Sequence, residues 1–173
     1  GIRNISCTDE NDAAIDAQII GGTTPYFYNW EDGQRTSNID NLAAGSYTLT
    51  ASDANGCNAI NTFQIQQPQP LSIQLDSIQN ASCEGVNDGN IQVTGRGGTG
   101  DYGFSWSNGA SSADNENIRS GTYILTLIDE NGCEVIDSFR VDAPAALNLT
   151  ANITSPTCIG SPDGSITLDV MGG

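Results

Sequence analysis

Residues 102–106 read Tyr-Gly-Phe-Ser-Trp, and residues 26–30 read Tyr-Phe-Tyr-Asn-Trp. In both stretches an aromatic residue occupies every second position. Strict alternation over four to eight residues is typical of a β-strand with one buried face. Each stretch therefore predicts a strand that directs its aromatic residues, Tyr26, Tyr28 and Trp30 in the first, into a hydrophobic core.

The two stretches belong to an internal repeat. Cys83 follows Cys7 by 76 positions, and Cys133 follows Cys57 by the same 76 positions. A third copy begins near Cys158, which follows Cys83 by 75 positions. The first two copies align without a gap and share Asn11-Asp12 with Asn87-Asp88, Gly21-Gly22-Thr23 with Gly97-Gly98-Thr99, Trp30 with Trp106, Tyr47 with Tyr123, Asp53 with Asp129, and Pro68 with Pro144.

The repeat divides the chain into residues 1–68, 69–144 and 145–173, which we call copy one, copy two and copy three. Solenoid repeats of about 20 to 50 residues need neighbours to bury a core, whereas about 75 residues suffice for a small independent domain. Copy three ends at Gly172-Gly173, where the other copies place an internal turn. We therefore expect the chain to be part of a longer array of separately folding domains.

Alternation continues outside the aromatic strand, and no segment shows a sustained helical stripe. Ile91 and Val93 share one face of an earlier predicted strand, as Ile166, Leu168 and Val170 do in copy three. In the last strand of copies one and two the alternation breaks. This predicts a β-bulge near Asn61 and Asp137, which would return Ile60 and Ile136 to the core.

The segments Gly45-Ser46-Tyr47 and Gly121-Thr122-Tyr123 resemble the tyrosine corner of immunoglobulin-like and fibronectin type III sandwiches. In that corner a Tyr at the start of a late strand donates a hydrogen bond to the loop before it. We predict an all-β chain of tandem immunoglobulin-like β-sandwich repeats, each about 75 residues long and each with one disulfide inside the domain.

The charge of the chain excludes several classes of function. It has 21 acidic residues, five Lys plus Arg, no His and a formal net charge of −16. Nucleic acids and anionic membranes repel such a chain. No apolar run approaches the about 20 residues of a membrane helix, and no signal peptide is visible. All five basic residues are Arg, so Lys and His chemistry is absent, and we expect no catalytic residues and no enzyme activity.

The cysteines suggest a covalent staple in each copy. We predict Cys7–Cys57 and Cys83–Cys133 disulfides, and a partner for Cys158 beyond residue 173. Closing a loop of about 50 residues would stabilise each domain by about 4 kcal/mol. The alternative is free buried thiols; a zinc site lacks ligands. This pairing puts both cysteines at one end of the domain and so implies an even number of strands, which fits poorly with an extended array.

The acidic turns are candidate calcium sites. Asp12 and Asp53 in copy one, and Asp88 and Asp129 in copy two, lie close in sequence to the cysteines, so the predicted disulfides would bring each pair together. Oxygen-rich loops of this kind can hold Ca²⁺. The same residues are also ordinary turn formers, and their spacing matches no EF-hand. We expect no other cofactor.

Three further motifs have a simpler interpretation than a binding or modification site. The glycine-rich run 95–100 resembles a phosphate loop, but no Lys and no helix follow it, so we interpret it as a turn. Phe27, on the outward face of its strand, could stack on a sugar, but copy two has Gly103 there. The N-x-Ser/Thr triplets would be glycan acceptors only in a eukaryotic secreted protein; they begin at Asn4, Asn80, Asn148 and Asn152.

Taken together, the motifs from Cys83 to Cys133 resemble the SprB repeat of very large surface adhesins of gliding bacteria of the Bacteroidota. The resemblance covers two copies and the start of a third, although copy one has Ala13 where the family has Gly and Glu31-Asp32 where copy two has Ser-Asn. It implies export by the type IX system, display as a cell-surface filament, and a role in attachment or gliding motility. PKD domains share the Tyr-x-Trp and Gly-x-Tyr pattern and would form the same sandwich.

We therefore expect a structural or adhesive segment of a secreted cell-surface protein. Its partners would be neighbouring repeats of the same chain and surface glycans or other surface proteins, with no nucleic acid and no membrane span in this segment. The alternative is a glycan-binding accessory module of a secreted hydrolase, which saturable binding to a polysaccharide would reveal. A third hypothesis is a scaffold for other surface proteins.

Overall fold

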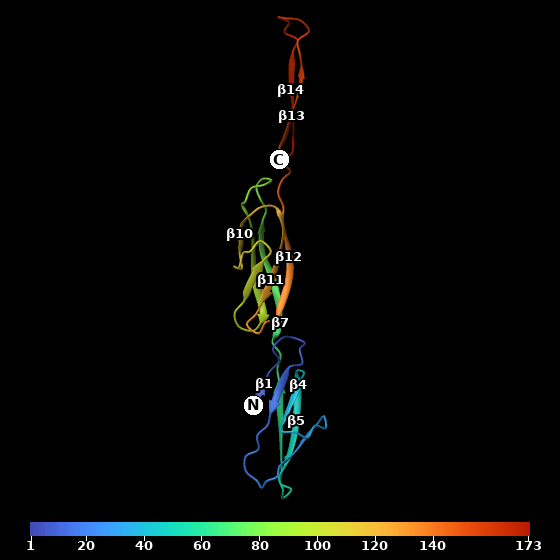
Figure 1. Cartoon of the computed structure of the whole chain (residues 1–173), viewed down its shortest axis with the longest axis vertical. Helices are drawn as coiled ribbons and strands as arrows, with labels where there is room; N and C mark the ends of the chain where they lie inside the picture. Colours follow the sequence, from blue (N-terminus) through green and yellow to red (C-terminus); the bar gives the residue numbers. More distant parts are fainter. The chain divides into compact units, whose positions relative to one another are not determined.

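The computed structural model describes residues 1–173 and contains β-strands and turns but no helix (Figure 1). None of the chain forms an apolar helix of membrane-spanning length. The strands are β1 (Ile2–Arg3), β2 (Ala13–Asp16), β3 (Phe27–Trp30), β4 (Asn38–Leu42), β5 (Gly45–Ser52), β6 (Asn58–Ile65), β7 (Gln69–Gln79), β8 (Gly89–Gly98), β9 (Gly103–Trp106), β10 (Asn115–Ile118), β11 (Gly121–Ile128), β12 (Glu134–Val141), β13 (Asn148–Thr154) and β14 (Ser165–Met171).

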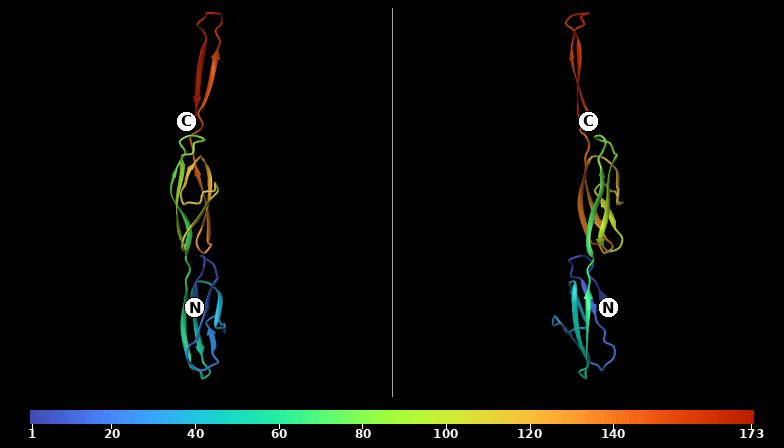
Figure 2. Two further views of the ribbon diagram at one scale, coloured as in Figure 1. Left: turned by 60° about the vertical axis from the view of Figure 1, so that its left-hand side comes forward. Right: turned by 180° about the vertical axis from the view of Figure 1, so that it is seen from behind.

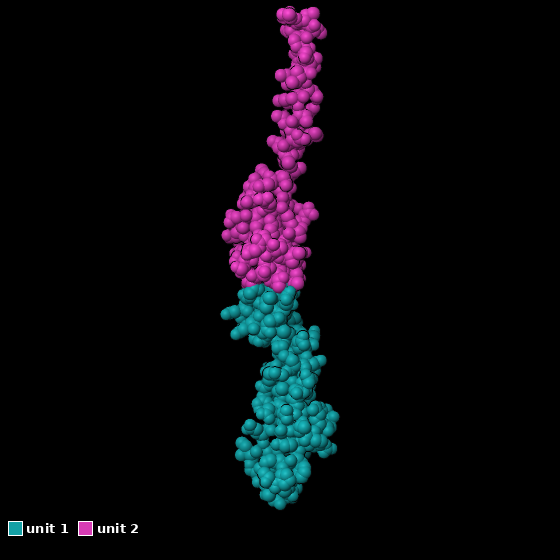
Figure 3. Space-filling view, in the orientation of Figure 1, with its two compact units in different colours: residues 1–73, 95–103, 127–135 teal, residues 74–94, 104–126, 136–173 magenta.

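The chain divides into two compact units, which Figure 3 colours separately. Unit 1 comprises Gly1–Ile73, Gly95–Gly103 and Leu127–Val135, and unit 2 comprises the remaining residues. Unit 1 thus contains copy one together with three short segments of copy two, residues 69–73, 95–103 and 127–135. The boundaries at residues 68 and 144 between the copies stay a prediction.

Copy one, within unit 1, is a sandwich of two three-stranded antiparallel sheets. One sheet has the strand order β1-β2-β4, and the other has the order β3-β5-β6. Ile15 pairs with Ile39 in the first sheet, and Trp30 pairs with Leu49 in the second. The side chains of both pairs belong to one buried cluster, so the two sheets pack face to face.

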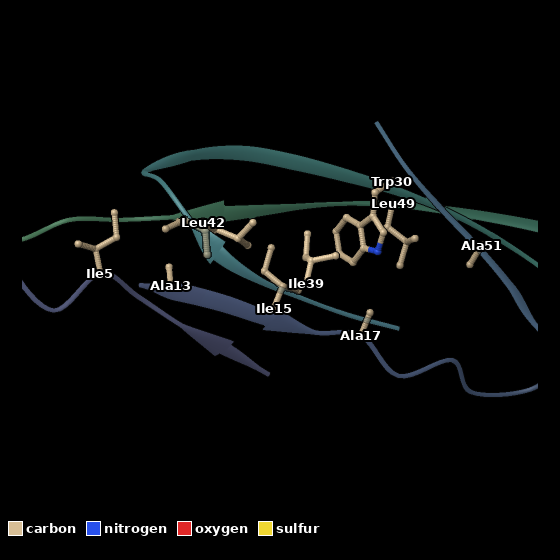
Figure 4. Packing of buried hydrophobic residues seen from close by; sticks show 10 residues of the cluster. Ile5, Ala13, Ile15, Ala17, Trp30, Ile39, Leu42, Leu49 and Ala51 are labelled. Carbon is tan, nitrogen blue, oxygen red and sulfur yellow. The ribbon is translucent and has the colours of Figure 1, made fainter. Parts of the chain in front are cut away.

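The core lies between these sheets and uses the alternating residues that the sequence predicts (Figure 4). Trp30 is 2% exposed, whereas its neighbour Phe27 at the other end of β3 is 58% exposed. Tyr28 and Phe63 pack against the cluster, and the rings of Trp30 and Phe63 lie 5.6 Å apart between centroids. The buried members of the cluster are Ile5, Ala13, Ile15, Ala17, Trp30, Ile39, Leu42, Leu49, Ala51 and Ile65.

The predicted bulge in the last strand is wrong. The pairing of β5 with β6 runs without interruption from Gly45↔Ile65 to Ser52↔Asn58, and Ile60 is 71% exposed. Every residue from Asn58 to Thr62 is exposed, so neither face of this half of β6 has to be apolar. In copy two the equivalent Ile136 is also exposed, at 60%.

The structure has its register shifts elsewhere. One lies where β2 pairs with β4, beside Asn41, and another lies where β10 pairs with β8, beside Asn117. Both residues have a φ of 55°, in the left-handed region that Asn tolerates better than most other residues. An extra residue of this kind bends its strand and re-aims the side chains that follow, as a β-bulge does.

Copy two repeats the two sheets of copy one, with the strand orders β10-β8-β7 and β12-β11-β9. Its buried apolar residues in unit 2 occupy repeat positions that are buried in copy one, or partly buried in the case of Tyr123 and Phe139, which correspond to Tyr47 and Phe63. They are Ala81, Ile91, Val93, Trp106, Ile118, Tyr123, Leu125, Phe139 and Val141. The buried Asn115 lies at the repeat position of Ile39.

Copy three consists of the hairpin β13–β14 (Figure 2). Its two strands pair only with each other, from Asn148↔Met171 to Thr154↔Ser165. Ile166, Leu168 and Val170 alternate as predicted but are exposed, because no second sheet covers them.

Candidate functional site: the acidic turns and the disulfide

The turn between β5 and β6 forms around the buried carboxylate of Asp53. Its Oδ1 accepts hydrogen bonds from the backbone N–H groups of Asn55 and Cys57, both at 2.9 Å, and its Oδ2 accepts one from Thr23 N at 3.0 Å. Gly56 closes the turn with a φ of 81°, which favours glycine. One side chain therefore satisfies three backbone donors and ties two separate turns together.

Copy two builds the same turn around Asp129. Its Oδ1 accepts from the N–H groups of Asn131 (3.0 Å) and Cys133 (2.9 Å), and its Oδ2 accepts from Thr99 N (2.8 Å). A Cβ added to Gly98 would lie 2.6 Å from Oδ2, so only glycine allows this approach. From the sequence, the Gly-Gly-Thr motif was interpreted as a separate turn. The contact between this motif and the Asp could have been inferred because both recur in the two copies.

Hydrogen bonds lower the pKa of several aspartates. The N–H of Thr23 is the largest cause that lowers the pKa of Asp53, followed by the N–H of Cys57. The pKa of Asp12 is lowered first by its hydrogen bonds from Ser6, whose N–H lies 3.0 Å from Oδ1. The equivalent pairs in the other copies lower the pKa of Asp88 through Ser82 and of Asp163 through Thr157.

These aspartates act as turn formers in the structure. Asp12 and Asp53 are not brought together, because Asp12 binds Ser6 near the end of β6 and Asp53 lies beside Cys57 at its start. No group of three or more acidic or cysteine side chains is placed to hold a metal ion. Calcium binding by Asp12, Asp53, Asp88 and Asp129 stays a prediction.

The tyrosine corner is confirmed in both copies. Tyr47 Oη donates to the carbonyl of Ala43 at 3.0 Å, and Tyr123 Oη donates to the carbonyl of Arg119 at 2.9 Å. In each case the acceptor lies four residues before the Tyr, in the loop that precedes its strand. The hydrogen bond therefore fixes how the chain enters β5 and β11.

Two asparagines hold the end of the last strand, a role that sequence reasoning missed. Asn4 Oδ1 accepts a hydrogen bond from Gln66 N at 3.1 Å, and Asn80 Oδ1 accepts one from Asp142 N at 3.0 Å. From the sequence, both residues were considered only as the first residues of N-x-Ser/Thr triplets. The missed signal was that Asn80 follows Asn4 at the repeat distance of 76 positions.

The disulfide of the structure differs from the predicted ones. Cys7 bonds to Cys133, 126 positions further along the chain, with the Cα atoms 5.6 Å apart. Cys57, Cys83 and Cys158 are free and exposed. Both predicted bonds, Cys7–Cys57 and Cys83–Cys133, are therefore wrong, and so is one intradomain disulfide in each copy.

The physical reason is that the two cysteines of copy one lie at opposite ends of β6. Cys57 directly precedes this strand, whereas Cys7 lies beside its end, where Ile5 N donates to Gln66 O (3.2 Å) and Thr8 Oγ1 to Pro68 O (3.2 Å). Eight strand residues span about 25 Å, far beyond the reach of a disulfide. In copy two, β12 likewise begins after Cys133 and ends beside Ala81, whose N–H donates to Asp142 O (2.9 Å).

This arrangement also resolves the conflict over strand number. In copies one and two the first cysteine (Cys7 or Cys83) lies where the last strand of the copy ends, and the second cysteine (Cys57 or Cys133) lies where that strand begins. A copy can therefore enter at one end and leave at the other, as an array requires.

The remaining candidates form no site. The run 95–100 ends β8 and turns into β9, and a Cβ on Gly97 would clash with the carbonyl of Pro70 (2.0 Å). Close backbone packing therefore explains this glycine without a phosphate. Phe27 is an isolated exposed aromatic residue on β3.

The fold and these turns define a class of protein: tandem immunoglobulin-like β-sandwich repeats. The SprB repeat family matches residues 2–35, 75–111 and 150–173, together more than half of the chain. The chain therefore belongs to the SprB repeat family. SprB repeat proteins are typically found at the cell surface, and the chain is a repeat segment of a surface adhesin-like protein.

One solved structure supports the fold. The chain is similar to three N-terminal domains of the highly immunogenic outer capsid protein (Hoc) of bacteriophage RB49, with 16% identity, a TM-score of 0.56 and coverage of 99% of this chain and 69% of that one. It also matches an amphioxus IgVJ-C2 molecule, with 17% identity, a TM-score of 0.38 and coverage of 77% and 97%. A comparison with curated proteins found no match.

Proposed function

We propose that this chain is a structural and adhesive segment of a very large cell-surface filament, exported by the type IX system and used in surface attachment or gliding motility. The observation that carries the proposal is the family match at three regularly spaced places, 2–35, 75–111 and 150–173, one in each copy. A chain that repeats one sandwich architecture is suited to extending from a surface and bearing load.

The chemistry of the chain is consistent with this role. The net charge of −16 keeps neighbouring molecules apart in solution and disfavours unspecific association. The side chains shared by the copies, such as Asp53 and Tyr47 in copy one, build turns rather than a pocket for a substrate. We infer that the partners are neighbouring repeats of the same chain, and surface glycans or other surface proteins.

An antibody against the purified chain tests the proposal. We expect it to label intact, unpermeabilised cells that produce the protein and to reduce their attachment or gliding, while an antibody against a cytoplasmic protein labels none of them. Labelling only after permeabilisation, or unchanged attachment and gliding at saturating antibody, would contradict the proposal. Saturable binding of the chain on a glycan array without any effect on attachment would favour a glycan-binding module of a secreted hydrolase instead.

A further inference from the structure

The disulfide joins unlike positions of the repeat. Cys7 is the first cysteine of copy one, and Cys133 is the second cysteine of copy two. Their Cα separation of 5.6 Å lies within the usual range of about 4.4 to 6.8 Å. The bond thus connects a first cysteine to the second cysteine of the copy that follows.

The free first cysteines occupy the same local structure as Cys7. In each copy the carbonyl of the first cysteine accepts a hydrogen bond from the residue three positions on: Glu10 N to Cys7 O and Val86 N to Cys83 O, both 3.2 Å, and Ser161 N to Cys158 O, 3.1 Å. Cys83 and Cys158 are exposed, so each thiol is accessible at the end of its copy. They differ from Cys7 in having no partner, not in backbone geometry.

The free second cysteine matches its bonded counterpart as well. The N–H of Cys57 lies 2.9 Å from Asp53 Oδ1, and the N–H of Cys133 lies 2.9 Å from Asp129 Oδ1. Cys57 is exposed. The acidic turn therefore holds a second cysteine in the bonding position before any partner is present.

A second contact accompanies the bonded pair. Asn131 Nδ2 donates to the carbonyl of Ser6, directly before Cys7, at 3.0 Å. The equivalent Asn55 donates to Thr23 Oγ1 within its own copy, at 3.1 Å, and Ser82 occupies the repeat position of Ser6. The residues for this contact thus recur beside the free cysteines.

We propose that Cys57, Cys83 and Cys158 are cross-linking sites, and that a disulfide joins the first cysteine of every copy to the second cysteine of the next. In any longer chain of these copies, Cys83 and Cys158 each form a disulfide with the second cysteine of the following copy, which lies at the acidic turn of that copy. Cys57 bonds to the first cysteine of a preceding copy. This inference goes beyond adhesion, because the disulfides link neighbouring domains to one another instead of closing a loop within one domain. We call this series of bonds the disulfide ladder.

Each bond forms by thiol–disulfide exchange. The two thiols lose two protons and two electrons in total, and the disulfide of a dithiol oxidoreductase of the export compartment accepts them and becomes a dithiol. One cysteine thiolate first attacks that disulfide, and the second thiolate then displaces the oxidoreductase from the mixed disulfide. An oxidising compartment outside the cytoplasm provides such an oxidant.

A lengthened chain tests the ladder. A second copy of residues 69–144 is inserted directly after Pro144, and an Ile136→Val substitution, placed only in the inserted copy, marks its second cysteine by mass. Ile136 is exposed, so we expect the marker to leave the fold unchanged. After secretion into the bacterial periplasm, peptides of the unreduced protein are analysed by mass spectrometry.

We expect a disulfide between Cys7 and the unmarked peptide, and a disulfide between Cys83 of the original copy two and the marked peptide. In the 173-residue chain we expect Cys83 to stay a free thiol. Replacing Cys83 in the lengthened chain (Cys83→Ser) should leave the marked cysteine free, with the β-sheet circular dichroism unchanged. A bond from Cys83 to the unmarked peptide, or a free Cys83 in the folded lengthened chain, would overturn the ladder. Antibody labelling of cells does not depend on these bonds, so either proposal can fail alone.

Discussion

At the scale of single residues, Asp53 carries several backbone contacts at once. An ionised carboxylate has only acceptor sites, and both oxygens of Asp53 face N–H groups. An Asn in its place would aim an amide N–H₂ at one of these donors. The requirement is therefore for a charged carboxylate and not simply for a polar residue.

This requirement predicts a pH dependence. Because the pKa of Asp53 is lowered in the folded state, its contribution to stability is present above the unfolded value of about 3.9 and is lost as pH falls through the lower folded value. Urea midpoints of the chain and of Asp53→Asn, measured in salt that screens surface charge, should differ at pH 7 and converge below about pH 4. An equal difference at pH 7 and pH 2 would contradict this role.

The same turn predicts the cost of a methyl group at Gly98. Gly98→Ala places a Cβ against Asp129, so the carboxylate must shift and its hydrogen bond to Thr99 weakens. Gly109→Ala is the matched control, since Gly109 has a φ of 89° and nothing near its absent Cβ. We expect about 1–2 kcal/mol of destabilisation in the control from backbone strain and a larger loss in Gly98→Ala. Equal urea midpoints in the two variants would contradict the close contact.

Loss of the tyrosine-corner hydroxyl should have a small, defined effect. Tyr123→Phe removes a hydrogen bond to the Arg119 carbonyl and keeps the ring, so we expect about 1 kcal/mol of destabilisation by urea unfolding. The control is Tyr28→Phe, because Tyr28 packs on the core through its ring. If Tyr28→Phe costs as much as Tyr123→Phe, the hydrogen bond is not the cause.

At the scale of elements, the alternating strands were the most predictable feature. Burial of one face imposes a period of two, so Tyr28, Trp30 and Trp106 fall on the inner side as the sequence indicates. The tyrosine corner was also predictable, because it depends on a contact only four residues away along the chain. Both patterns depend on residues that are close in sequence, so they can be recognised without knowing the tertiary structure.

Features that depend on distant partners were not predictable from the sequence. The break in alternation at Ile60 suggested a bulge, but β6 extends there without a packed face, which only the opposite sheet decides. The actual register shifts lie beside Asn41 and Asn117. The disulfide partner of Cys7 depends on whether Cys7 lies beside the start or the end of β6. The spacing of the cysteines along the chain does not indicate which end this is.

At the scale of the whole molecule, the long disulfide loop should be visible when the chain is stretched. With Cys7 bonded to Cys133, the residues between them cannot extend, so the oxidised chain pulled from both ends should be shorter by about 430 Å than the reduced chain. Single-molecule force spectroscopy before and after addition of a thiol reductant measures this difference.

The double variant Cys7→Ser with Cys133→Ser supplies the control for stretching. It should show the long contour length with and without reductant. An oxidised wild-type chain that extends as far as this variant would mean that the bond from Cys7 to Cys133 does not form in solution.

The position of this bond determines which parts of the polymer feel tension. Force entering at Cys7 passes directly to Cys133 through the sulfur atoms, and the two acidic turns and most of both sandwiches are bypassed. Cys158 follows Cys133 by only 25 positions. If Cys158 forms its own forward link, a pull along the array loads only short segments of this length, which contain the edge strand β12 and strand β13, and the strands between Cys7 and Cys133 stay outside the path of the force.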